Sequence, residues 1–265
     1  MPLPAPGPDR TAMVTGASSG IGAMIARELS RRGHHVTLVA RSVDKLEALA
    51  AELVTADVIA LDLADRPGRA SLLDHVGELG RVVDILVNNA GLSTLGPVSR
   101  SDPTAEMNMI EVDVVAVADL CSRILPGMVQ RGRGAVLNVA STAAFQPLPG
   151  QAGYGAGKAF VLSYTQSLAG ELRGTGVTAT TLCPGPVHTG FGERAGFSVE
   201  DAEAALPSVM WLTAEDVAKS AVEGMAKGRL VVIPGKVNRV AAALSQVTPR
   251  SLLLPVLVKG HPGLR

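Results

Sequence analysis

Short apolar runs alternate with helical periods from one end of the chain to the other. Seven runs have the length of strands and are apolar nearly throughout: 12–15, 36–40, 58–62, 84–88, 135–140, 177–183 and 230–233. Such runs are typical of strands that are covered on both faces. Between them, Ser42 can cap one helix, and Thr213 can cap another with Asp216 at the reciprocal position. The pattern predicts a doubly wound parallel α/β sheet of about seven strands with helices on both faces.

The pattern indicates one domain with an extension at each end. The 265 residues are 47% hydrophobic, which is enough to bury a large core, and no linker, repeat or low-complexity block divides them. We expect a flexible arm over residues 1–10, where four prolines cluster, a main domain over 11–235 and a tail over 236–265. Within the domain, the stretch 184–212 shows no period and is typical of a functional loop.

Charge and composition exclude several classes of protein. The 24 basic and 24 acidic side chains cancel and 3% of residues are aromatic, so the chain lacks the charge and stacking surface of a nucleic-acid binder. No apolar run approaches the roughly 20 residues of a membrane span. Cys121 and Cys183 lie in apolar segments without metal-ligand spacing, which favours buried thiols in a cytoplasmic protein. After Glu223 every charged side chain is basic.

A glycine-rich turn follows the first strand directly and opens a helix. Its spacing, Gly16-x-x-x-Gly20-x-Gly22, departs from the usual Gly-x-Gly-x-x-Gly, but its position is the one that a dinucleotide motif requires. Glycines there let the backbone approach a pyrophosphate, which the free amides at the start of a helix can bind. An ordinary glycine turn is the alternative. The cofactor-binding candidates are Gly16, Ser18, Ser19, Gly20, Ile21 and Gly22.

The end of the second strand indicates which dinucleotide is bound. An NAD site would place a carboxylate here to hold the ribose 2′-hydroxyl, but the chain has Ala40 followed by Arg41. An arginine can hold a 2′-phosphate with two hydrogen bonds. The sequence therefore predicts NADP(H), with a solvated Arg41 beside a helix start as the alternative.

A tyrosine and a lysine stand one helical turn apart in the segment after the fifth strand. Tyr154 and Lys158 are four residues apart, so both side chains point to the same side of a helix. An ammonium close to a phenol favours the phenolate and lowers the pKa of the tyrosine toward neutrality, where it can act as an acid or a base. Taken alone, the spacing also fits an ordinary surface pair.

Several motifs together resemble the classical short-chain dehydrogenase/reductase family. They occur in the family's order: Thr15-Gly16-x-x-x-Gly20-x-Gly22, Asn88-Asn89-Ala90-Gly91, Ser141, Tyr154-x-x-x-Lys158 and Pro184-Gly185. The likeness covers about residues 11–235. It implies a single-domain Rossmann-like fold, a nicotinamide cofactor, no metal, and a homodimer or homotetramer built on the helices that carry Asp113 and Tyr154.

The resemblance also implies a role for each matching residue. Tyr154 would be the general acid that protonates a carbonyl oxygen, Lys158 would lower its pKa and bind the nicotinamide ribose, and Ser141 would orient the substrate oxygen. Asp62 would receive the adenine amino group. The remaining residues expected at the cofactor are Asn89, Ala90, Gly91, Pro184, Gly185, Val187 and Thr189.

One position departs from the family pattern. The family usually places an asparagine on the helix before the serine strand, where it positions a water in a proton relay, and this chain has Asp113 there. An aspartate accepts a hydrogen bond from water but does not donate one unless it is protonated. Asp113 therefore joins Ser141, Tyr154 and Lys158 as a catalytic candidate. Gly155 and Gly157 are a second departure, and either loosen the catalytic helix or admit close packing.

The segment after the sixth strand indicates the substrate class. It carries large apolar side chains with few charges among them: Phe191, Phe197, Val199, Leu206, Met210 and Trp211. An apolar lid favours a hydrophobic ketone, aldehyde or alcohol, although these residues can also simply seat the loop on the core. His188 is a candidate for substrate contact or a bystander.

The sequence therefore favours an NADP(H)-dependent oxidoreductase for a hydrophobic carbonyl or alcohol. A dinucleotide-binding sensor or scaffold of low activity is the alternative, and Asp113 is its support. The tail adds a third hypothesis, because an apolar stripe with basic neighbours can contact a membrane surface, cover the substrate pocket or form a subunit interface. The stripe consists of Val237, Val240, Ala241, Leu244 and Val247.

Overall fold

Seven parallel strands form the central sheet of the computed structural model, which describes residues 3–196, 206–260 and 262–264. In chain order they are β1 (Arg10–Thr15), β2 (His35–Ala40), β3 (Ala56–Ala60), β4 (Val82–Asn88), β5 (Gly134–Val139), β6 (Val177–Leu182) and β9 (Val231–Val232). Their order across the sheet is β3-β2-β1-β4-β5-β6-β9, and every pairing is parallel. The predicted Rossmann-like sheet is confirmed.

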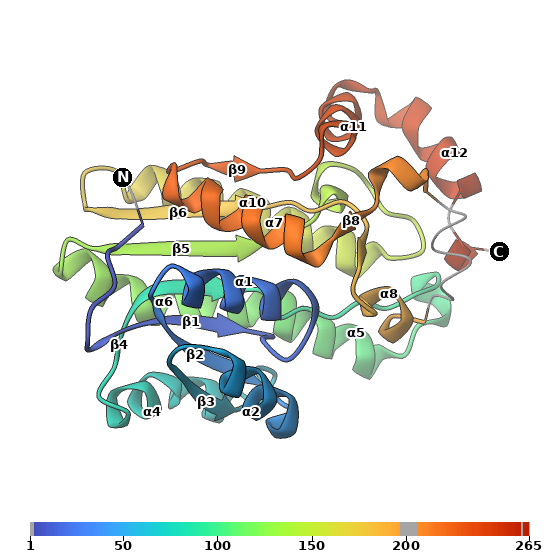
Figure 1. Ribbon diagram of the computed structural model, residues 1–265. Helices are drawn as coiled ribbons and strands as arrows, with labels where there is room; N and C mark the ends of the chain where they lie inside the picture. Colours follow the sequence, from blue (N-terminus) through green and yellow to red (C-terminus); the bar gives the residue numbers. More distant parts are fainter. Residues whose placement is uncertain (1–2, 197–205, 261, 265) are drawn as a thin grey trace.

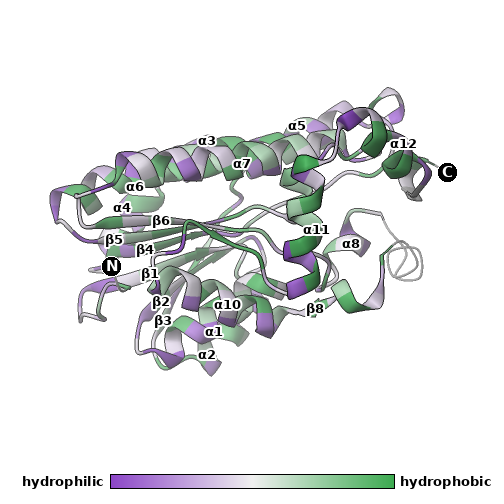
Figure 2. Ribbon diagram, turned by 90° about the horizontal axis from the view of Figure 1, so that it is seen from above, coloured by the Kyte–Doolittle hydropathy of each residue, from purple (hydrophilic) through white to green (hydrophobic). Residues whose placement is uncertain are grey.

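Helices cover both faces of this sheet (Figure 2). On one face lie α1 (Gly20–Arg31), α2 (Val43–Glu52) and α10 (Ala214–Ala226). On the other lie α3 (Arg66–Ala70), α4 (Leu72–Glu78), α5 (Pro103–Ile110), α6 (Ala116–Gln130) and α7 (Ala152–Glu171). A π-helical turn, η2 (Glu111–Val115), joins α5 to α6, and short 3-10 turns are η1 (Val98–Arg100), η3 (Thr142–Phe145), η4 (Ser208–Met210) and η5 (Pro262–Leu264).

Two hydrophobic layers hold the sheet between the helices. Because side chains alternate along a strand, Ala12 and Val14 of β1 pack into the layer beneath α1 and α10, while Met13 packs into the opposite layer. All three side chains are fully buried. Strands such as β1 are therefore apolar at successive positions because they contribute to both layers.

The two helix starts predicted from the sequence lie where expected. Thr213 Oγ1 accepts a hydrogen bond from the Asp216 amide at 3.1 Å, and donates one to Asp216 Oδ2 at 2.8 Å. The carboxylate thus binds the capping hydroxyl instead of the capping residue's own amide. Ser42 directly precedes α2, but its side chain makes no capping hydrogen bond.

Residues 3–9 lie against the domain, where the sequence predicted a flexible arm. Leu3 packs on the core, and Arg81 Nη1 donates to the Pro8 carbonyl at 2.5 Å. Arg133 donates to the Ala5 carbonyl. The arm is therefore attached by both apolar and polar contacts.

The loop and the tail gather at the carboxyl end of the sheet, toward which the arrows of β1 and β5 point (Figure 1). The stretch 184–212 contains β7 (Val187–His188), α8 (Phe191–Arg194) and η4, and β8 (Leu212–Thr213) pairs with β7. Phe197 and Val199 lie outside the described residues. The tail forms α11 (Lys236–Val247) and α12 (Arg250–Gly260). Among the described helices, none has the length and hydropathy needed to cross a membrane.

Both cysteines are free and buried, as predicted. Burial raises the pKa of Cys121 to about 11 and that of Cys183 to about 12. Because the thiolate is the reactive form, these thiols are unreactive near neutral pH.

Candidate active site

A cleft of about 950 Å³ opens at the carboxyl ends of the strands. It brings together nearly all the site residues predicted from sequence, although they are spread over residues 16–189. The predicted residues that line it are Gly16, Ser18, Ser19, Gly20, Ile21, Arg41, Asp62, Asn89, Ala90, Gly91, Ser141, Tyr154, Lys158, Pro184, Gly185, Val187 and Thr189. Gly22 and Asp113 are not in its wall but contact residues that are. Crevices at this edge are the usual ligand sites of open α/β sheets.

The glycine turn forms one side of the cleft. Gly16 and Gly20 have φ values of +63° and +56°, a region that side chains other than glycine rarely adopt. A Cβ at Gly22 would overlap the Asn89 side chain and the Gly16 carbonyl. The turn leads into α1, and the Ser19 side chain at its start makes no capping hydrogen bond. The first amides of α1 are therefore available to an anionic ligand, as a pyrophosphate site requires.

Asn89 and Thr15 fasten this turn to the end of β4. Asn89 Nδ2 donates to the carbonyls of Thr15 at 3.0 Å and Gly16 at 3.2 Å. Thr15 Oγ1 accepts from the amides of Asn89 at 3.0 Å and Ala90 at 3.2 Å. Thr15 was not among the predicted site residues, but it holds the turn in shape.

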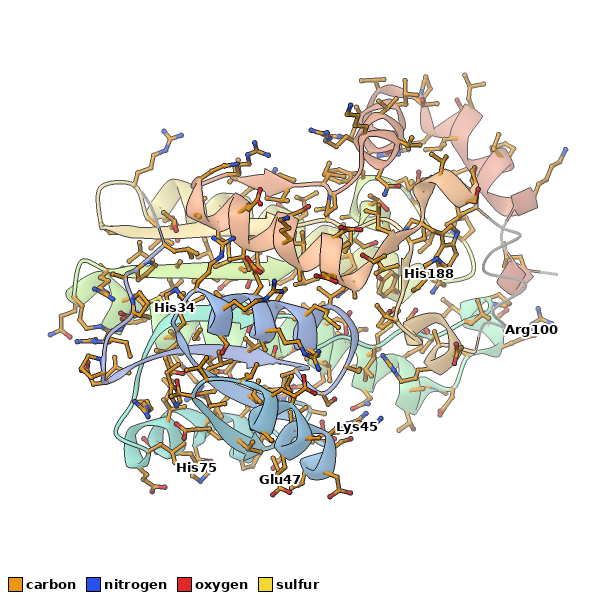
Figure 3. The ribbon with its side chains drawn as sticks, in the orientation of Figure 1. His34, Lys45, Glu47, His75, Arg100 and His188 are labelled. Atoms are coloured by element: carbon orange, nitrogen blue, oxygen red, sulfur yellow. The ribbon has the colours of Figure 1, made fainter. Side chains whose placement is uncertain are left out.

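A cationic corner lies where β2 and β3 end. Arg41 is exposed, and its Nη1 lies 3.8 Å from Asp62 Oδ2. Lys45 lines the same part of the cleft and projects from α2 (Figure 3). Lys45 was not predicted from the sequence. The available signal was its position, because it is a second cation shortly after Arg41, in the first turn of α2.

Ser141, Tyr154 and Lys158 meet on the opposite wall. Ser141 follows β5, and its Oγ accepts from the Ala143 amide at 3.1 Å. Lys158 Nζ lies 5.5 Å from the centre of the Tyr154 ring and donates to the Val139 carbonyl at 3.3 Å. The predicted common side of the helix is confirmed, because both residues of α7 line the cleft.

Asp113 points toward this group from behind the cleft. It lies in η2 with 1% of its surface exposed, and its Oδ2 is 2.9 Å from Lys158 Nζ. Its Oδ1 accepts from the Leu92 amide at 2.7 Å. The π-helical turn inserts one residue into the helix at this point, a feature often found at functional sites. Asp113 thus forms an ion pair with Lys158, an arrangement that the sequence did not reveal.

Glycines lie at several close approaches around α7, but not all of these positions require a glycine. A Cβ on Gly157 would lie 3.4 Å from Val114 Cγ2, and one on Gly155 would lie 2.9 Å from Leu148 Cβ. A Cβ on Gly91 would lie 3.2 Å from Lys158 Nζ. The structure therefore supports the close-packing interpretation for Gly155, whereas a Cβ on Gly157 would make an ordinary contact.

The electrostatics of the group differ from the sequence-based expectation. Burial raises the pKa of Tyr154, and the Asp113 carboxylate raises it further, while Lys158 and a hydrogen bond with Ser141 lower it. The net pKa is above the ordinary value because burial outweighs the ammonium, so the prediction of a lowered tyrosine pKa is wrong. Burial lowers the pKa of Lys158, but Asp113, Tyr154 and Cys183 together raise it above its ordinary value. Burial in turn raises the pKa of Asp113 against the effect of Lys158.

Apolar side chains cover the open end of the cleft. Phe191 lies over Tyr154 with their ring centres 5.9 Å apart, and His188 stacks on Trp211 at 4.7 Å. Figure 3 labels His188 at this end of the molecule. Leu206 and Met210 line the same wall, as do Ala241, Val256 and Leu257 of the tail. The loop residues therefore face the cleft, and part of the tail covers it.

Sequence and structure comparisons relate the chain to known proteins. The profile of a family described as short chain dehydrogenase matches residues 10–196. The chain is 35% identical over 206 residues to an NADP-dependent 3-hydroxy acid dehydrogenase of Salmonella typhi, covering 74% of this chain and 83% of that protein. A short-chain dehydrogenase from Sphingobium yanoikuyae, solved in complex with NADPH, matches with a TM-score of 0.80 and 33% identity over 93% of this chain and 95% of that chain. The bulky-bulky ketone specific alcohol dehydrogenase from Comamonas testosteroni matches with a TM-score of 0.76 and 30% identity, over 96% and 95% of the two chains.

Proposed function

The chain belongs to the short-chain dehydrogenase/reductase family, and from that premise we propose that it is an NADP(H)-dependent oxidoreductase for a hydrophobic ketone or aldehyde, or the corresponding alcohol. The observation that carries the proposal is the meeting of Ser141, Tyr154 and Lys158 on one wall of a cleft whose other wall is the glycine turn. A proton donor thus faces a site fitted to a dinucleotide.

The residues at the cleft fit the cofactor. The glycine turn leaves no room for a Cβ and presents the first amides of α1, so it would hold the pyrophosphate. Arg41 and Lys45 would hold the 2′-phosphate, and Asp62 the adenine amino group. Lys158 would bind the nicotinamide ribose, with Pro184, Gly185, Val187 and Thr189 around the nicotinamide. When bound, the nicotinamide supplies or accepts the hydride.

The protein's own residues orient the substrate and move one proton. In reduction, the Tyr154 hydroxyl donates its proton to the carbonyl oxygen, and the Ser141 hydroxyl donates a hydrogen bond to the same oxygen. In oxidation, ionised Tyr154 accepts the proton of the alcohol. The protonated Lys158 stabilises the tyrosinate, and Asp113 acts as a positioning residue that holds Lys158 in place.

The wall of the cleft supports an apolar substrate. Phe191 lies beside Tyr154, Met210 and Trp211 add large apolar surfaces to the cleft, and the tail adds Val256 and Leu257. Such surfaces favour a ligand that transfers readily out of water. Two relatives support the proposal by likeness, since the Comamonas testosteroni enzyme is specific for bulky-bulky ketones and the Salmonella typhi enzyme is NADP-dependent.

A substrate panel tests the proposal. We expect purified protein to consume NADPH with bulky apolar ketones and aldehydes, followed at the nicotinamide absorbance, and to do so faster than with small charged carbonyls. Binding of NADPH without turnover across the whole panel would instead favour the sensor or scaffold. Faster turnover of charged carbonyls would overturn the apolar substrate class.

Replacing Asp113 with asparagine should shift the pH profile of oxidation. The Asp113 carboxylate raises the pKa of Tyr154, so Asp113→Asn should lower that pKa. Because oxidation needs ionised Tyr154, its rate rises with pH through this pKa, and the rising limb should move to lower pH. Any change in the affinity for NADPH should be small, because Asp113 lies outside the cleft wall and Lys158 keeps its hydrogen bond to the Val139 carbonyl.

Glu111→Gln is the matched control, since Glu111 lies in the same turn but pairs with Arg66 and Arg69 instead of Lys158. It should leave the limb in place. An unaltered profile in Asp113→Asn would make Asp113 a spectator. Complete loss of activity with the fold intact would give the carboxylate an acid-base role of its own.

We also propose a cellular compartment and an oligomeric state for the enzyme. Two free, buried thiols suit a reducing compartment, so we propose the cytoplasm.

We also propose a homodimer or homotetramer through α5 to α7, where Met107 and Phe160 are exposed. Sedimentation as a monomer at micromolar concentration would contradict the oligomer.

A further inference from the structure

Helix α11 turns its apolar face to solvent. Four large apolar side chains, at spacings of three and four residues, are between 39% and 77% exposed: Val237, Val240, Leu244 and Val247. The opposite face is buried and consists of Asn238, Ala242 and Ser245. A surface helix of a globular protein normally has the reverse arrangement. The exposed stripe therefore indicates a surface that binds another molecule.

The next helix also exposes large apolar side chains, and because they stand two residues apart they lie on two sides of the helix. In α12 the exposed large side chains are Leu252, Leu254, Val256 and Val258. Figure 2 shows hydrophobic residues on both helices at the end of the molecule that carries the cleft. We call these eight side chains of α11 and α12 the tail surface. Exposed apolar surface concentrated on adjacent helices marks an interaction site more often than isolated apolar residues do.

The charge around the tail surface is of one sign. The sequence has no acidic residue after Glu223, whereas Lys236, Arg239 and Lys259 lie in α11 and α12, as does Arg250, which donates to the carbonyls of Ser245 and Phe145. Lys236 and Arg239 are exposed beside the stripe. An apolar helix face with flanking lysine and arginine is typical of helices that lie in the interface of an anionic bilayer.

The same charge argues against a second copy of the chain as the occupant. In a symmetric dimer, the tail surface would meet itself and bring these cations together. Like charges facing one another across an interface oppose association. Anionic lipid headgroups, in contrast, attract the cations, and the valines and leucines can be buried among the acyl chains.

The tail surface also adjoins the mouth of the cleft. Val256 lines the cleft and is 67% exposed, so it belongs to both. Leu257 and Ala241 line the cleft from the same two helices. A ligand dissolved in the outer part of a bilayer would thus reach the cleft along an apolar path.

We propose that the tail surface binds an anionic membrane surface, with α11 and α12 lying in the interface, and that the cleft takes its apolar substrate from the lipid. The second part rests on the proposed function, whereas the first rests on the tail alone. The protein would be a peripheral enzyme that associates reversibly with lipid.

Vesicle co-sedimentation of the full-length protein without cofactor or substrate tests the membrane contact. We expect binding to vesicles that contain phosphatidylglycerol, weaker binding to phosphatidylcholine alone, and a decrease with added salt. Val240→Gln with Leu244→Gln should weaken binding by at least about tenfold, because each such side chain gains that much or more on burial. Neither residue lines the cleft, so turnover of a water-soluble ketone should be unchanged.

Val54→Gln is the matched control, because Val54 is 80% exposed and lies between α2 and β3, away from the tail. It should bind vesicles like the unmodified protein. Absence of binding to anionic vesicles, or equal binding by all variants, would overturn the proposal. Conversion of an oligomer to a monomer by the double substitution, without vesicle binding, would overturn it in favour of a subunit interface. Vesicle binding with no ketone turnover would contradict the proposed function alone.

Discussion

Replacing Tyr154 with phenylalanine should lower turnover at least about 100-fold, since this is the lower range of what a positioned general acid contributes. The phenylalanine ring keeps the packing against Phe191 but has no proton to donate and no oxygen to ionise. Lys158 keeps its contacts with Asp113 and Val139, so the affinity for NADPH should be nearly unchanged. The lost step is therefore proton transfer alone.

Tyr164→Phe is the control for this experiment. Tyr164 lies on the same helix and stacks on Phe160, but it does not line the cleft. Initial rates and NADPH titrations of both variants separate chemistry from binding. Near-native turnover in Tyr154→Phe would remove this residue from the mechanism, and comparable losses in both variants would indicate a general loss of structure.

Replacing Arg41 with alanine should weaken NADPH binding about ten- to a hundredfold and leave NADH binding nearly unchanged. A hydrogen bond to a charged group is worth roughly 1.5 to 3 kcal/mol, which corresponds to this range. Lys45 lines the same corner and remains in the variant, so the loss should lie toward the lower end. Removing both cations should exceed the effect of either one.

Arg31→Ala serves as the control for Arg41, because Arg31 is similarly exposed but lies at the far end of α1 from the glycine turn. Fluorescence titrations with both dinucleotides give the ratio of affinities. Equal losses for NADPH and NADH, or a native preference for NADH, would show that Arg41 does not read the 2′-phosphate.

The sheet could be predicted closely because its strands are buried on both faces. Each of the seven apolar runs became a strand within two residues of the expected bounds. The first strand begins earlier than its apolar run because Arg10 pairs through its backbone with Val82, and backbone pairing does not depend on an apolar side chain. The apolar pattern thus located the strands but not all of their ends.

The orientation of Asp113 could not be predicted because it depends on contacts between distant segments. The Leu92 amide and Lys158 approach it from two other parts of the chain, and the π-helical turn that aims it inward has no sequence signature of its own. The direction of the Tyr154 pKa was missed for a related reason. The spacing of a tyrosine and a lysine indicates their proximity, but the burial that outweighs it depends on the whole wall of the cleft.

The tail shows a different limit of sequence reasoning. The stripe on α11 was visible in the pattern, and such a stripe usually faces the core. Here the interior beside α11 is already filled, and Asn238 packs against Gly185, where a Cβ would lie 2.6 Å from its side chain. Only the folded structure reveals which face of the helix is left outside.

Transfer of deuterium from the cofactor to the product tests hydride transfer most directly. NADPH labelled with deuterium at both C4 positions of the nicotinamide would be incubated with the protein and a bulky apolar ketone, and the product analysed by mass spectrometry and NMR. We expect an alcohol that carries one deuterium on its carbinol carbon, formed far more slowly by Tyr154→Phe. A product without deuterium on that carbon, or bound NADPH with no reduction of any carbonyl, would contradict the proposed oxidoreductase.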